Sequence, residues 1–452
     1  MKKIIFLVLA LAALSACKQK IDTFTVTSGS ANFTKYISVG NSLFAGYADG
    51  ALYHSGQVNS IPNIIAGQLQ QAGSGPFVQP MVTSEYGVGF TGSMPKFVLG
   101  VSMDCMGVPS LGPIPSTGTL EPLAPVGYDV NNFAVPGAKS FHMLAPGYGN
   151  PAGLLTNPPS ANPYFFRFAK TPATSSVLGD AMAANATFFT MWLGDNDVLS
   201  YALSGGVGDT ITSPAFFTTV MGGVLQGLTA NHAKGAISTI PDVTAIPYFT
   251  TIPYNGLVLT RQTLVDSVNG AMLAYGLPFH YVLGQNPFMV PDPNSANPYF
   301  KVRLMVPGEL VLLSVPQDSM KCYGMGIIGK LTFVPYPIPK QYFLSLADIS
   351  KIQTATTAYN QIINTLADAT HFNLAVVDMN ANLKTLQKGI VWDGIKLNAT
   401  FVTGGAFSLD GIHLNPRGCA LCANYFIDAI NAKFGSTVPK VSIANYNGLI
   451  FP

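Results

Sequence analysis

Two short segments, far apart in the chain, carry side chains that together could perform nucleophilic catalysis. Ser42 follows the β-branched run 36–39 and Gly40, where a buried strand would end. Asp410 and His413 lie three residues apart near the other end of the chain. A serine becomes a useful nucleophile when a histidine accepts its proton and a carboxylate orients that histidine. These three residues are therefore candidates for nucleophile, acid and base, although either segment alone is equally typical of a surface turn.

Two further residues could stabilise the negative charge that develops when a serine attacks an ester. Gly137 follows an apolar run, so its backbone N–H could point into a cleft, and Asn196 follows another run with a side-chain amide. Together with the N–H of Ser42 they would form an oxyanion hole with three donors. Each also has an ordinary interpretation, Gly137 as a turn residue and Asn196 as a cap at a strand end.

The elements that must position these residues alternate along the chain. Short apolar runs predict five strands, at 36–39, 132–135, 187–193, 235–240 and 372–377. Between and after them lie predicted helices, at 60–69, 216–232, 346–367 and from Pro416 onward. Strands separated by helices predict an α/β fold with a parallel sheet and helices on both faces. Ser42, Gly137 and Asn196 then follow strand ends, which is where open α/β sheets place their ligands.

Two long segments interrupt this alternation. Residues of about 73–129 and 278–341 are rich in Gly and Pro, and we interpret both as loop insertions within one domain covering 33–452. Cys105 lies in the first insertion and Cys322 in the second. A bridge between them and two free thiols both remain open alternatives at this point.

The N-terminus predicts export and a lipid anchor. Residues 1–16 combine two lysines with an apolar stretch too short to span a bilayer, as in a signal peptide. Cys17 follows Leu-Ser-Ala, which resembles a bacterial lipobox and predicts lipidation of Cys17, with 17–32 as a tether. The alternative is an ordinary cleavage site with an incidental cysteine. With an anchor, we expect the protein in the bacterial envelope, at the outer membrane.

Composition excludes several functions. Only 10% of the residues are charged and the net charge is +2, without a basic stripe, so a nucleic-acid partner is not expected. Cys419 and Cys422 form a C-x-x-C pair inside a predicted amphipathic helix, and we interpret them as buried apolar residues rather than metal ligands. The histidines other than His413 are single and without ligand spacing, so no metal site is expected.

Taken together, four segments resemble the sequence blocks of the SGNH hydrolases, also called the GDSL family. In chain order these segments are Gly40-Asn41-Ser42-Leu43, Asn132-Phe133-Ala134-Val135-Pro136-Gly137, Gly194-Asp195-Asn196-Asp197 and Asp410-Gly411-Ile412-His413. The resemblance implies a flavodoxin-like three-layer α/β/α sandwich with a five-stranded sheet. It also implies Ser42, Asp410 and His413 as catalytic residues, Ser42, Gly137 and Asn196 as the oxyanion hole, and no cofactor. The departure is Asn41, where the family usually has Asp; it affects the energetics of the turn rather than the identity of the nucleophile.

The resemblance therefore predicts a serine esterase that hydrolyses carboxylic esters through an acyl-serine, of the lipase or carboxylesterase type. The substrate would be a small-molecule or lipid ester. Alternatives are a polysaccharide O-acetyl esterase and a non-catalytic lipoprotein that binds lipid or glycan, because a fold does not by itself decide function. The aromatic residues Phe44, Tyr47 and Trp192 beside the motifs either line an acyl pocket or belong to the core.

Overall fold

The centre of the protein is one parallel sheet, seen in a computed structural model that describes residues 25–451. Its five strands are β1 (Tyr36–Gly40), β8 (Asn132–Ala134), β9 (Phe188–Trp192), β10 (Lys234–Ser238) and β19 (Ala375–Val377). They are ordered β8-β1-β9-β10-β19, and all four neighbouring pairs are parallel. In chain order this is 2-1-3-4-5, the order of flavodoxin-like sheets. The predicted five-stranded parallel sheet is confirmed.

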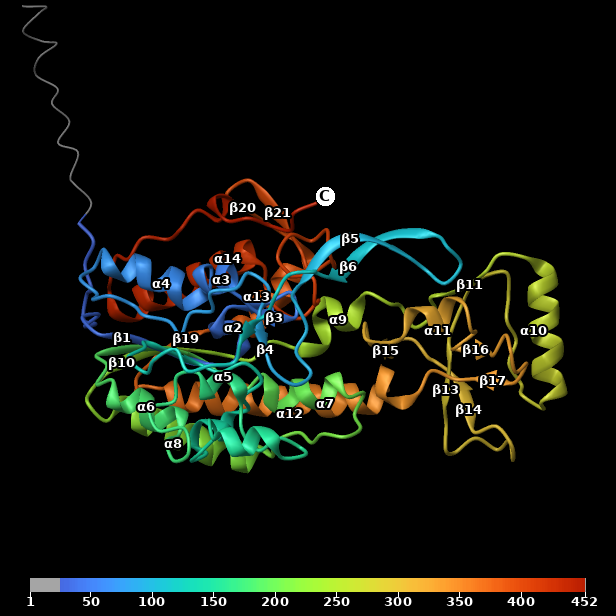
Figure 1. Ribbon diagram of the computed structural model, residues 1–452, viewed down its shortest axis with the longest axis horizontal. Helices are drawn as coiled ribbons and strands as arrows, with labels where there is room; N and C mark the ends of the chain where they lie inside the picture. Colours follow the sequence, from blue (N-terminus) through green and yellow to red (C-terminus); the bar gives the residue numbers. More distant parts are fainter. Residues whose placement is uncertain (1–24, 452) are drawn as a thin grey trace, which may run out of the picture.

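Helices cover both faces of this sheet (Figure 1). One face carries α4 (Ile61–Gln70), α13 (Met379–Lys388) and α14 (Pro416–Phe434), and the other carries α6 (Val177–Ala183), α7 (Asn196–Leu203), α8 (Pro214–Thr229) and α12 (Leu346–Ala367). Strand residues such as Val39, Phe189 and Ile237 are at most 1% exposed because helices cover the sheet on either side. The arrangement is a three-layer α/β/α architecture.

Predicted boundaries differ from the observed ones where a local hydrogen bond decides the end of an element. Helix α8 begins at Pro214 rather than 216, because the Ser213 hydroxyl caps the helix by accepting the Phe216 N–H. Strand β19 begins at Ala375 rather than 372, because Asn373 has φ +52° and belongs to the turn that closes α12. Such turns are set by φ/ψ preferences that hydrophobic periodicity does not reveal.

Short elements complete the main body. They are β2 (Tyr47–Ala48), β3 (Ala51–Leu52), α3 (His54–Val58), α5 (Pro163–Phe166), α9 (Pro247–Thr250), β20 (Ile390–Trp392) and β21 (Ile395–Leu397). Strands β2 and β3 pair antiparallel shortly after Ser42, and β20 and β21 form a second small hairpin.

The segment preceding β1 lies against the end of α14. The Ser30 N–H donates to the Phe434 carbonyl at 2.8 Å, and Gly29 lies so close that a Cβ there would come within 2.2 Å of the same oxygen. Ala31 is buried as well. Residues 29–31, which belong to the tether predicted for 17–32, therefore pack on the main body. The predicted signal peptide and Cys17 lie outside the described residues. Within residues 25–451, no helix is long and apolar enough to cross a membrane.

The first insertion contains a long hairpin. Strands β5 (Phe97–Met103) and β6 (Pro109–Pro115) pair antiparallel over their whole length. In Figure 1 this hairpin, which we call the arm, runs from the centre of the molecule toward a lobe at one end. The short strands β4 (Val88–Gly89) and β7 (Glu121–Pro122) pair with each other in parallel, one before and one after the arm in the sequence.

The second insertion forms that lobe, which has hydrophobic cores of its own. It begins earlier than the predicted residue 278 and covers about 252–344, because α10 (Gln262–Ala274) packs Val265, Val268 and Met272 against Tyr281. Its other elements are short: β11 (Leu257–Leu259), β12 (Gly284–Asn286), β13 (Met289–Pro291), β14 (Val302–Leu304), β15 (Leu310–Val311), α11 (Gln317–Lys321), β16 (Ile327–Ile328), β17 (Pro335–Tyr336) and β18 (Phe343–Leu344). We call residues 252–344 the insertion lobe.

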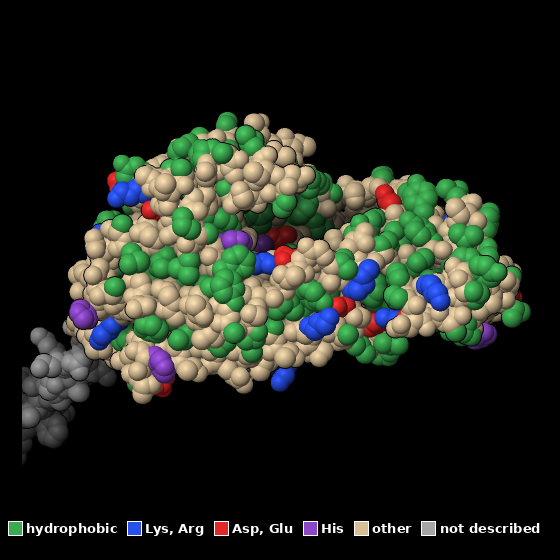
Figure 2. Space-filling view, turned by 90° about the horizontal axis from the view of Figure 1, so that it is seen from below, with side chains coloured by type: hydrophobic (Ala, Val, Ile, Leu, Met, Phe, Trp, Pro, Cys, Tyr) green, Lys and Arg blue, Asp and Glu red, His purple; other side chains and the backbone are tan. Residues whose placement is uncertain are grey.

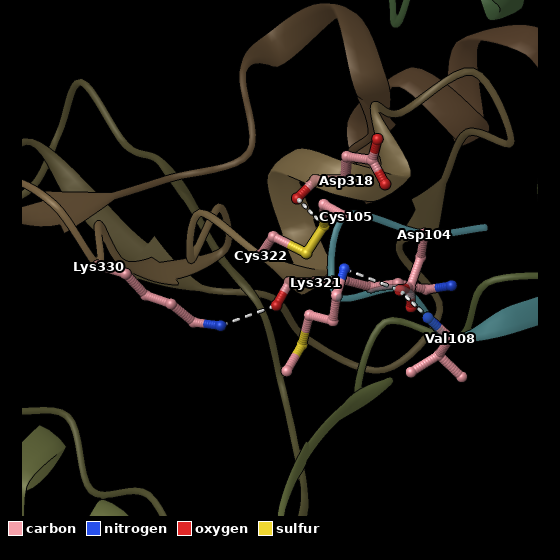
Figure 3. The surroundings of a disulfide bond; sticks show 8 residues. Asp104, Cys105, Val108, Asp318, Lys321, Cys322 and Lys330 are labelled. Atoms are coloured by element: carbon pink, nitrogen blue, oxygen red, sulfur yellow. Dashed lines mark hydrogen bonds between the residues drawn. A yellow bond between two sulfur atoms is a disulfide. The ribbon is translucent and has the colours of Figure 1, made fainter.

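A disulfide joins the two insertions. Cys105, in the turn at the tip of the arm, is bonded to Cys322 at the end of α11 (Figure 3). The Asp104 carboxylate orders the same turn by accepting the N–H groups of Met106 and Val108, each at 2.9 Å. Of the two alternatives left open by the sequence, the structure contains the bridge.

Candidate active site

Ser42 lies just beyond the carboxyl end of strand β1, which pairs with β8 and β9, and is the first residue of the short helix α2 (Ser42–Ala45). Asn41 caps this helix, and its Oδ1 accepts the Leu43 N–H at 3.1 Å. Gly40 is required by a close approach and not by a special turn, since a Cβ would come within 2.6 Å of the Trp192 carbonyl on β9. The strand, the glycine and the cap together fix the serine at the edge of the sheet.

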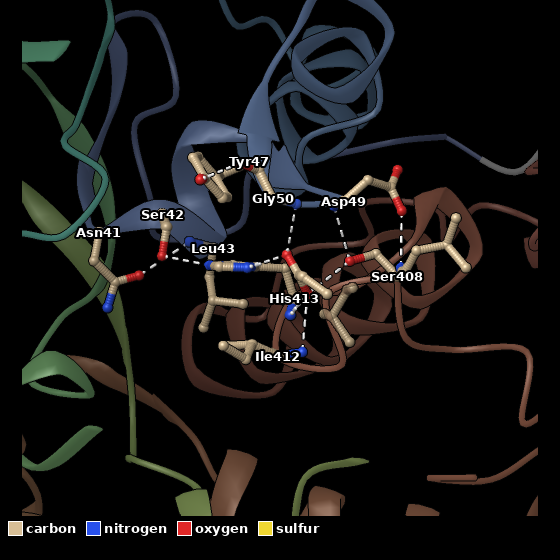
Figure 4. A network of polar contacts seen from close by, with 12 residues as sticks. Asn41, Ser42, Leu43, Tyr47, Asp49, Gly50, Ser408, Ile412 and His413 are labelled. Carbon is tan, nitrogen blue, oxygen red and sulfur yellow. Dashed lines mark hydrogen bonds and ion pairs between the residues drawn. The ribbon is translucent and has the colours of Figure 1, made fainter. Parts of the chain in front are cut away.

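The structure brings Ser42 together with His413 (Figure 4), and His413 with Asp410. His413 Nε2 lies 2.8 Å from Ser42 Oγ, and His413 Nδ1 lies 2.7 Å from Asp410 Oδ2. With Nδ1 protonated, the imidazole donates to Asp410 and offers Nε2 as acceptor for the serine hydroxyl. This is the geometry of a serine activated by a general base whose tautomer is held by a carboxylate.

Asp410 is held in its ionised form. Burial by itself raises the pKa of this carboxyl, but the attraction of His413 and hydrogen bonds outweigh that effect, and the pKa lies well below its usual range. Its Oδ1 accepts the N–H groups of Ile412 and His413, both at 2.8 Å, and the Ser408 hydroxyl at 3.0 Å. Its Oδ2 accepts the Gly50 N–H at 3.1 Å besides the histidine. A carboxylate with these donors keeps its charge and its orientation.

Asp49 and Ser408, which the sequence did not single out, position Asp410. Asp49 accepts the Leu409 N–H on one oxygen at 2.8 Å and the Tyr53 hydroxyl on the other at 2.7 Å. The Asp49 N–H donates to Ser408 Oγ at 3.1 Å. These bonds connect the turn after α2 with the loop that precedes His413. The only signal in the sequence is an Asp-Gly turn shortly after Ser42, which is too common to be informative.

The predicted oxyanion donors are free to bind an oxygen. Among the described residues, neither the Ser42 N–H nor the Gly137 N–H has a hydrogen-bond acceptor. Gly137 adopts φ +78°, which favours glycine. Asn196, the first residue of α7, donates one amide hydrogen to the Ala138 carbonyl at 2.9 Å, and the second has no acceptor among the described residues. The bond to Ala138 holds the amide beside the loop that contains Gly137.

The structure explains why residue 41 is Asn and not the Asp of a Gly-Asp-Ser-Leu turn. The Asn41 Nδ2 donates to Asp195 Oδ2 at 2.8 Å, and Trp192 Nε1 donates to Asp195 Oδ1 at 3.0 Å. Burial raises the pKa of Asp195 to about 6, despite these bonds. An aspartate at position 41 would place two buried carboxylates in contact, so the amide is the compatible partner here. Asp195 is occupied by these donors, and the acid bonded to His413 is Asp410.

The aromatic residues near the motifs have different surroundings. Phe44 is fully buried and contacts the rings of Trp192 and Phe426, so it belongs to the core. The Tyr47 ring lies 4.8 Å from the imidazole of His413, centroid to centroid, and its hydroxyl donates to the Gly50 carbonyl at 2.5 Å. Tyr47 therefore flanks the candidate base.

An apolar cavity of about 70 Å³ adjoins the candidate site. Leu43, which follows the serine, and Ile412, which precedes the histidine, both line it, together with Trp192 and with Cys422 of α14. Cys419 and Cys422 are both buried and unbridged, in agreement with their interpretation as apolar residues. Burial raises the pKa of the Cys419 thiol to about 12, which leaves it un-ionised.

Two other titratable residues, His142 and Asp242, have structural surroundings. His142 accepts the Lys139 N–H and stacks on Tyr148, and burial lowers its pKa to about 4. Asp242 caps a short helix by accepting the N–H and the hydroxyl of Thr244. In residues 25–451, no group of three or more His, Cys, Asp and Glu side chains is arranged to hold a metal ion.

The surface is hollowed between the main body and the insertion lobe. In Figure 2, histidine and acidic side chains are visible in this hollow, and hydrophobic side chains gather on its far wall. In Figure 1 the arm passes above the same region, between the centre of the body and the lobe.

Comparisons with known proteins identify no family for this chain. No model of a protein family matches the chain, and no curated protein does. Among solved structures, the chain is similar to the crystal structure of the lipase/acylhydrolase from Enterococcus faecalis, with 10% sequence identity and a TM-score of 0.32. The match covers 90% of this chain and 100% of the other. At this level of similarity, function has to be argued from the residues of the chain itself.

Proposed function

We propose that this protein is a serine hydrolase that cleaves carboxylic esters through an acyl-serine intermediate. One observation carries the proposal: the unbroken relay from Ser42 Oγ through His413 to a buried, ionised Asp410. A structural serine needs no histidine, and a structural histidine needs no carboxylate that is itself held by several backbone and side-chain donors. Their combination at the carboxyl ends of the sheet strands is typical of acyl transfer. Beside them lie the N–H groups of Ser42 and Gly137, which have no acceptor among the described residues.

The cycle would use each group in a defined role. His413 Nε2 accepts the proton of Ser42 as Oγ attacks the ester carbonyl, and the N–H groups of Ser42 and Gly137 and the Asn196 amide bind the oxyanion. The imidazolium, stabilised by Asp410, then protonates the leaving alcohol. Water repeats the sequence with His413 as base and releases the acid.

We further propose that the chain is a hydrolase of the SGNH or GDSL class. The support is positional: Ser42 follows β1, Gly137 follows β8 and Asn196 follows β9, which are three adjacent strands of one sheet. The strand order 2-1-3-4-5 fits a flavodoxin-like sandwich. The hydrogen bond from Asn41 to Asp195 connects the first and third of the four motif segments directly.

The preferred activity is of the carboxylesterase or lipase type. The cavity lined by Leu43 and Ile412, which are the sequence neighbours of Ser42 and His413, is mainly apolar, and this suits an acyl chain better than a sugar. Polysaccharide deacetylation is the competing outcome, and it would appear as a sharp preference for acetate.

The test is hydrolysis of p-nitrophenyl esters from acetate to palmitate by residues 18–452, with Ser42→Ala beside it. We expect a loss of roughly 10⁴-fold or more in kcat for the variant. Ser267→Ala, which changes an exposed serine on α10, is the matched control and should keep full activity. Equal activity in Ser42→Ala, or no hydrolysis of any ester by the unmodified protein, would refute the proposal and leave a binding protein as the better hypothesis.

We also propose that the protein is attached to the bacterial envelope through a lipid on Cys17. The support is the sequence of residues 1–17 alone. Expression in a bacterium with labelled palmitate tests it: label should enter the protein and be lost in Cys17→Ser. Cleavage without label would indicate an ordinary exported protein.

A further inference from the structure

The arm has two chemically different faces. In the antiparallel register, Val101 pairs with Leu111 and Met103 with Pro109, and side chains alternate between faces along each strand. One face therefore carries only apolar residues: Phe97, Leu99, Val101, Met103, Pro109, Leu111, Pro113 and Pro115. The opposite face begins with the pair of Val98 and Ile114 and is then small and polar toward the tip, where glycine pairs with glycine and serine with serine. A ribbon with one apolar face is expected to cover something with that face.

The apolar face begins at the candidate active site. The Phe97 N–H donates to the Asp49 carbonyl at 2.8 Å, and the Phe97 ring lies against Gly50, where a Cβ would come within 2.9 Å of it. The Gly50 N–H in turn donates to Asp410. Leu99, the next residue on this face, is 8% exposed. Gly50 thus connects the root of the apolar face to the acid that orients His413.

Beyond this root, the apolar face is open to solvent. Val101, Met103 and Leu111 are 61%, 68% and 50% exposed, although they continue the face that Phe97 and Leu99 begin. Exposed apolar side chains that form a continuous patch mark a binding surface more often than isolated ones do.

The disulfide explains how the arm can stay extended without a packed core. An isolated two-stranded ribbon is marginal in water. The bond between Cys105 and Cys322 stabilises the extended arm in place of packing contacts, because it fixes the far end of the arm on the insertion lobe. The arm is therefore held at both ends, at Gly50 near the site and at the lobe.

We propose that the apolar face of the arm binds the aliphatic chain of the ester substrate, and that the enzyme therefore prefers long-chain esters. This inference rests on the proposed function. The cavity of about 70 Å³ beside Leu43 holds only a few carbon atoms. A longer chain must leave it, and the apolar face starts beside Gly50, whose N–H donates to Asp410, and runs from there toward the insertion lobe (Figure 1). Val101, Leu111 and Met103 are then the residues that determine chain-length preference, and the disulfide keeps the arm in place.

The experiment compares kcat/KM for p-nitrophenyl dodecanoate and p-nitrophenyl butyrate in one detergent buffer and uses their ratio. Val101→Ser with Leu111→Ser should lower this ratio roughly tenfold, since each buried methylene contributes about fourfold to binding. The matched control is Ser102→Ala with Ser110→Ala, a cross-strand pair on the other face, which should leave the ratio unchanged. Cys105→Ser with Cys322→Ser should also lower the ratio. If circular dichroism shows that the first pair does not fold, Leu111→Ala alone makes the same test.

The outcomes separate the inference from the proposed function. A ratio that stays at the unmodified value in the apolar-face variant overturns the inference while ester hydrolysis stands, as does a protein that cleaves butyrate but not dodecanoate. An unchanged ratio together with a gel-filtration mass that halves in the variant also overturns it, and assigns the face to contact between two copies. A protein that hydrolyses neither ester overturns the inference, and it refutes the proposed function as well only if no ester from acetate to palmitate is hydrolysed.

Discussion

The hydrogen bond between Asn41 and Asp195 offers a sharp test of how this sequence departs from a Gly-Asp-Ser-Leu turn. The two side chains are 1% and 4% exposed, and their bond is 2.8 Å long. Asn41→Asp replaces the donor by a second carboxylate and leaves two buried acids in contact. Asp195→Asn removes the carboxylate that accepts from both Asn41 and Trp192, and the new amide has a single oxygen with which to accept. The double variant, Asn41→Asp with Asp195→Asn, reverses the bond: the amide at position 195 donates to the carboxylate at position 41, and its oxygen still accepts from Trp192.

The magnitudes follow from burial. A hydrogen bond to a charged group contributes about 1.5–3 kcal/mol, and a buried polar group left without a partner costs about 1–3 kcal/mol more. At pH 7 we therefore expect Asn41→Asp to lower the free energy of unfolding by roughly 3–5 kcal/mol. Asp195→Asn should lower it by less, about 0–2 kcal/mol, because the change also removes a buried carboxylate whose ionised form is disfavoured. The double variant should lose only about 1 kcal/mol, which gives a coupling energy on the order of 3 kcal/mol or more.

The assay is urea unfolding of the four proteins, followed by circular dichroism. Asn364→Asp, an exposed change on α12, is the control for the substitution itself and should stay within about 0.5 kcal/mol of the unmodified protein. Single-variant costs that simply add, with a coupling below about 0.5 kcal/mol, would refute the account of this pair.

The same pair predicts a pH dependence. The pKa of Asp195 is raised by burial to about 6, so the folded protein still holds this proton where the unfolded chain, with a value of 3.8, has released it. Stability from this group is therefore highest at acidic pH and falls by about 3 kcal/mol as the pH rises from about 4 to 6. Asp195→Asn should lack this fall, and urea unfolding curves at pH values between about 4 and 7 would reveal the difference.

Three further predictions concern catalysis and the disulfide. Asp410→Asn should lower kcat for ester hydrolysis by roughly 10⁴-fold with little change in KM, because the imidazole of His413 loses the acceptor that fixes its tautomer; a loss below about tenfold would contradict this role. Asn196→Ala should lower kcat by about 10²–10³-fold by removing one oxyanion donor, and an effect confined to KM would instead indicate a role in binding substrate. Cys105→Ser with Cys322→Ser should lower the free energy of unfolding by up to about 5 kcal/mol, since the bridge closes a loop with a sequence separation of 217, and an unchanged midpoint in urea would argue against a constraining bridge.

The main elements could be predicted from the sequence because their signals are local. Apolar runs of strand length, and a Ser or Asn cap followed by Pro, placed the five sheet strands and helices such as α4 and α14 to within a few residues. The motif segments were also recognisable, since Gly40, Gly137 and Asn196 follow closely after apolar runs. Periodicity and capping act within one element, so one sequence is enough to detect them.

Other features depend on which segments meet in space, and no local pattern contains that information. The arm and the insertion lobe consist of short strands whose pairing was not visible, and the lobe begins before residue 278 because α10 packs into a core of its own. Asp49 and Ser408 are ordinary turn residues until the fold places them around Asp410, across a sequence separation of 359 between the two.

The sequence by itself determined the residue types and the order of the proposed serine hydrolase site: Ser42, Gly137, Asn196, Asp410 and His413. Only the tertiary structure decided that His413 reaches Ser42, that Asn41 bonds Asp195, and that Cys105 meets Cys322. The physical reason is that hydrogen bonds and disulfides require atoms within a few ångströms, and that proximity is created by packing of the whole core rather than by any segment alone.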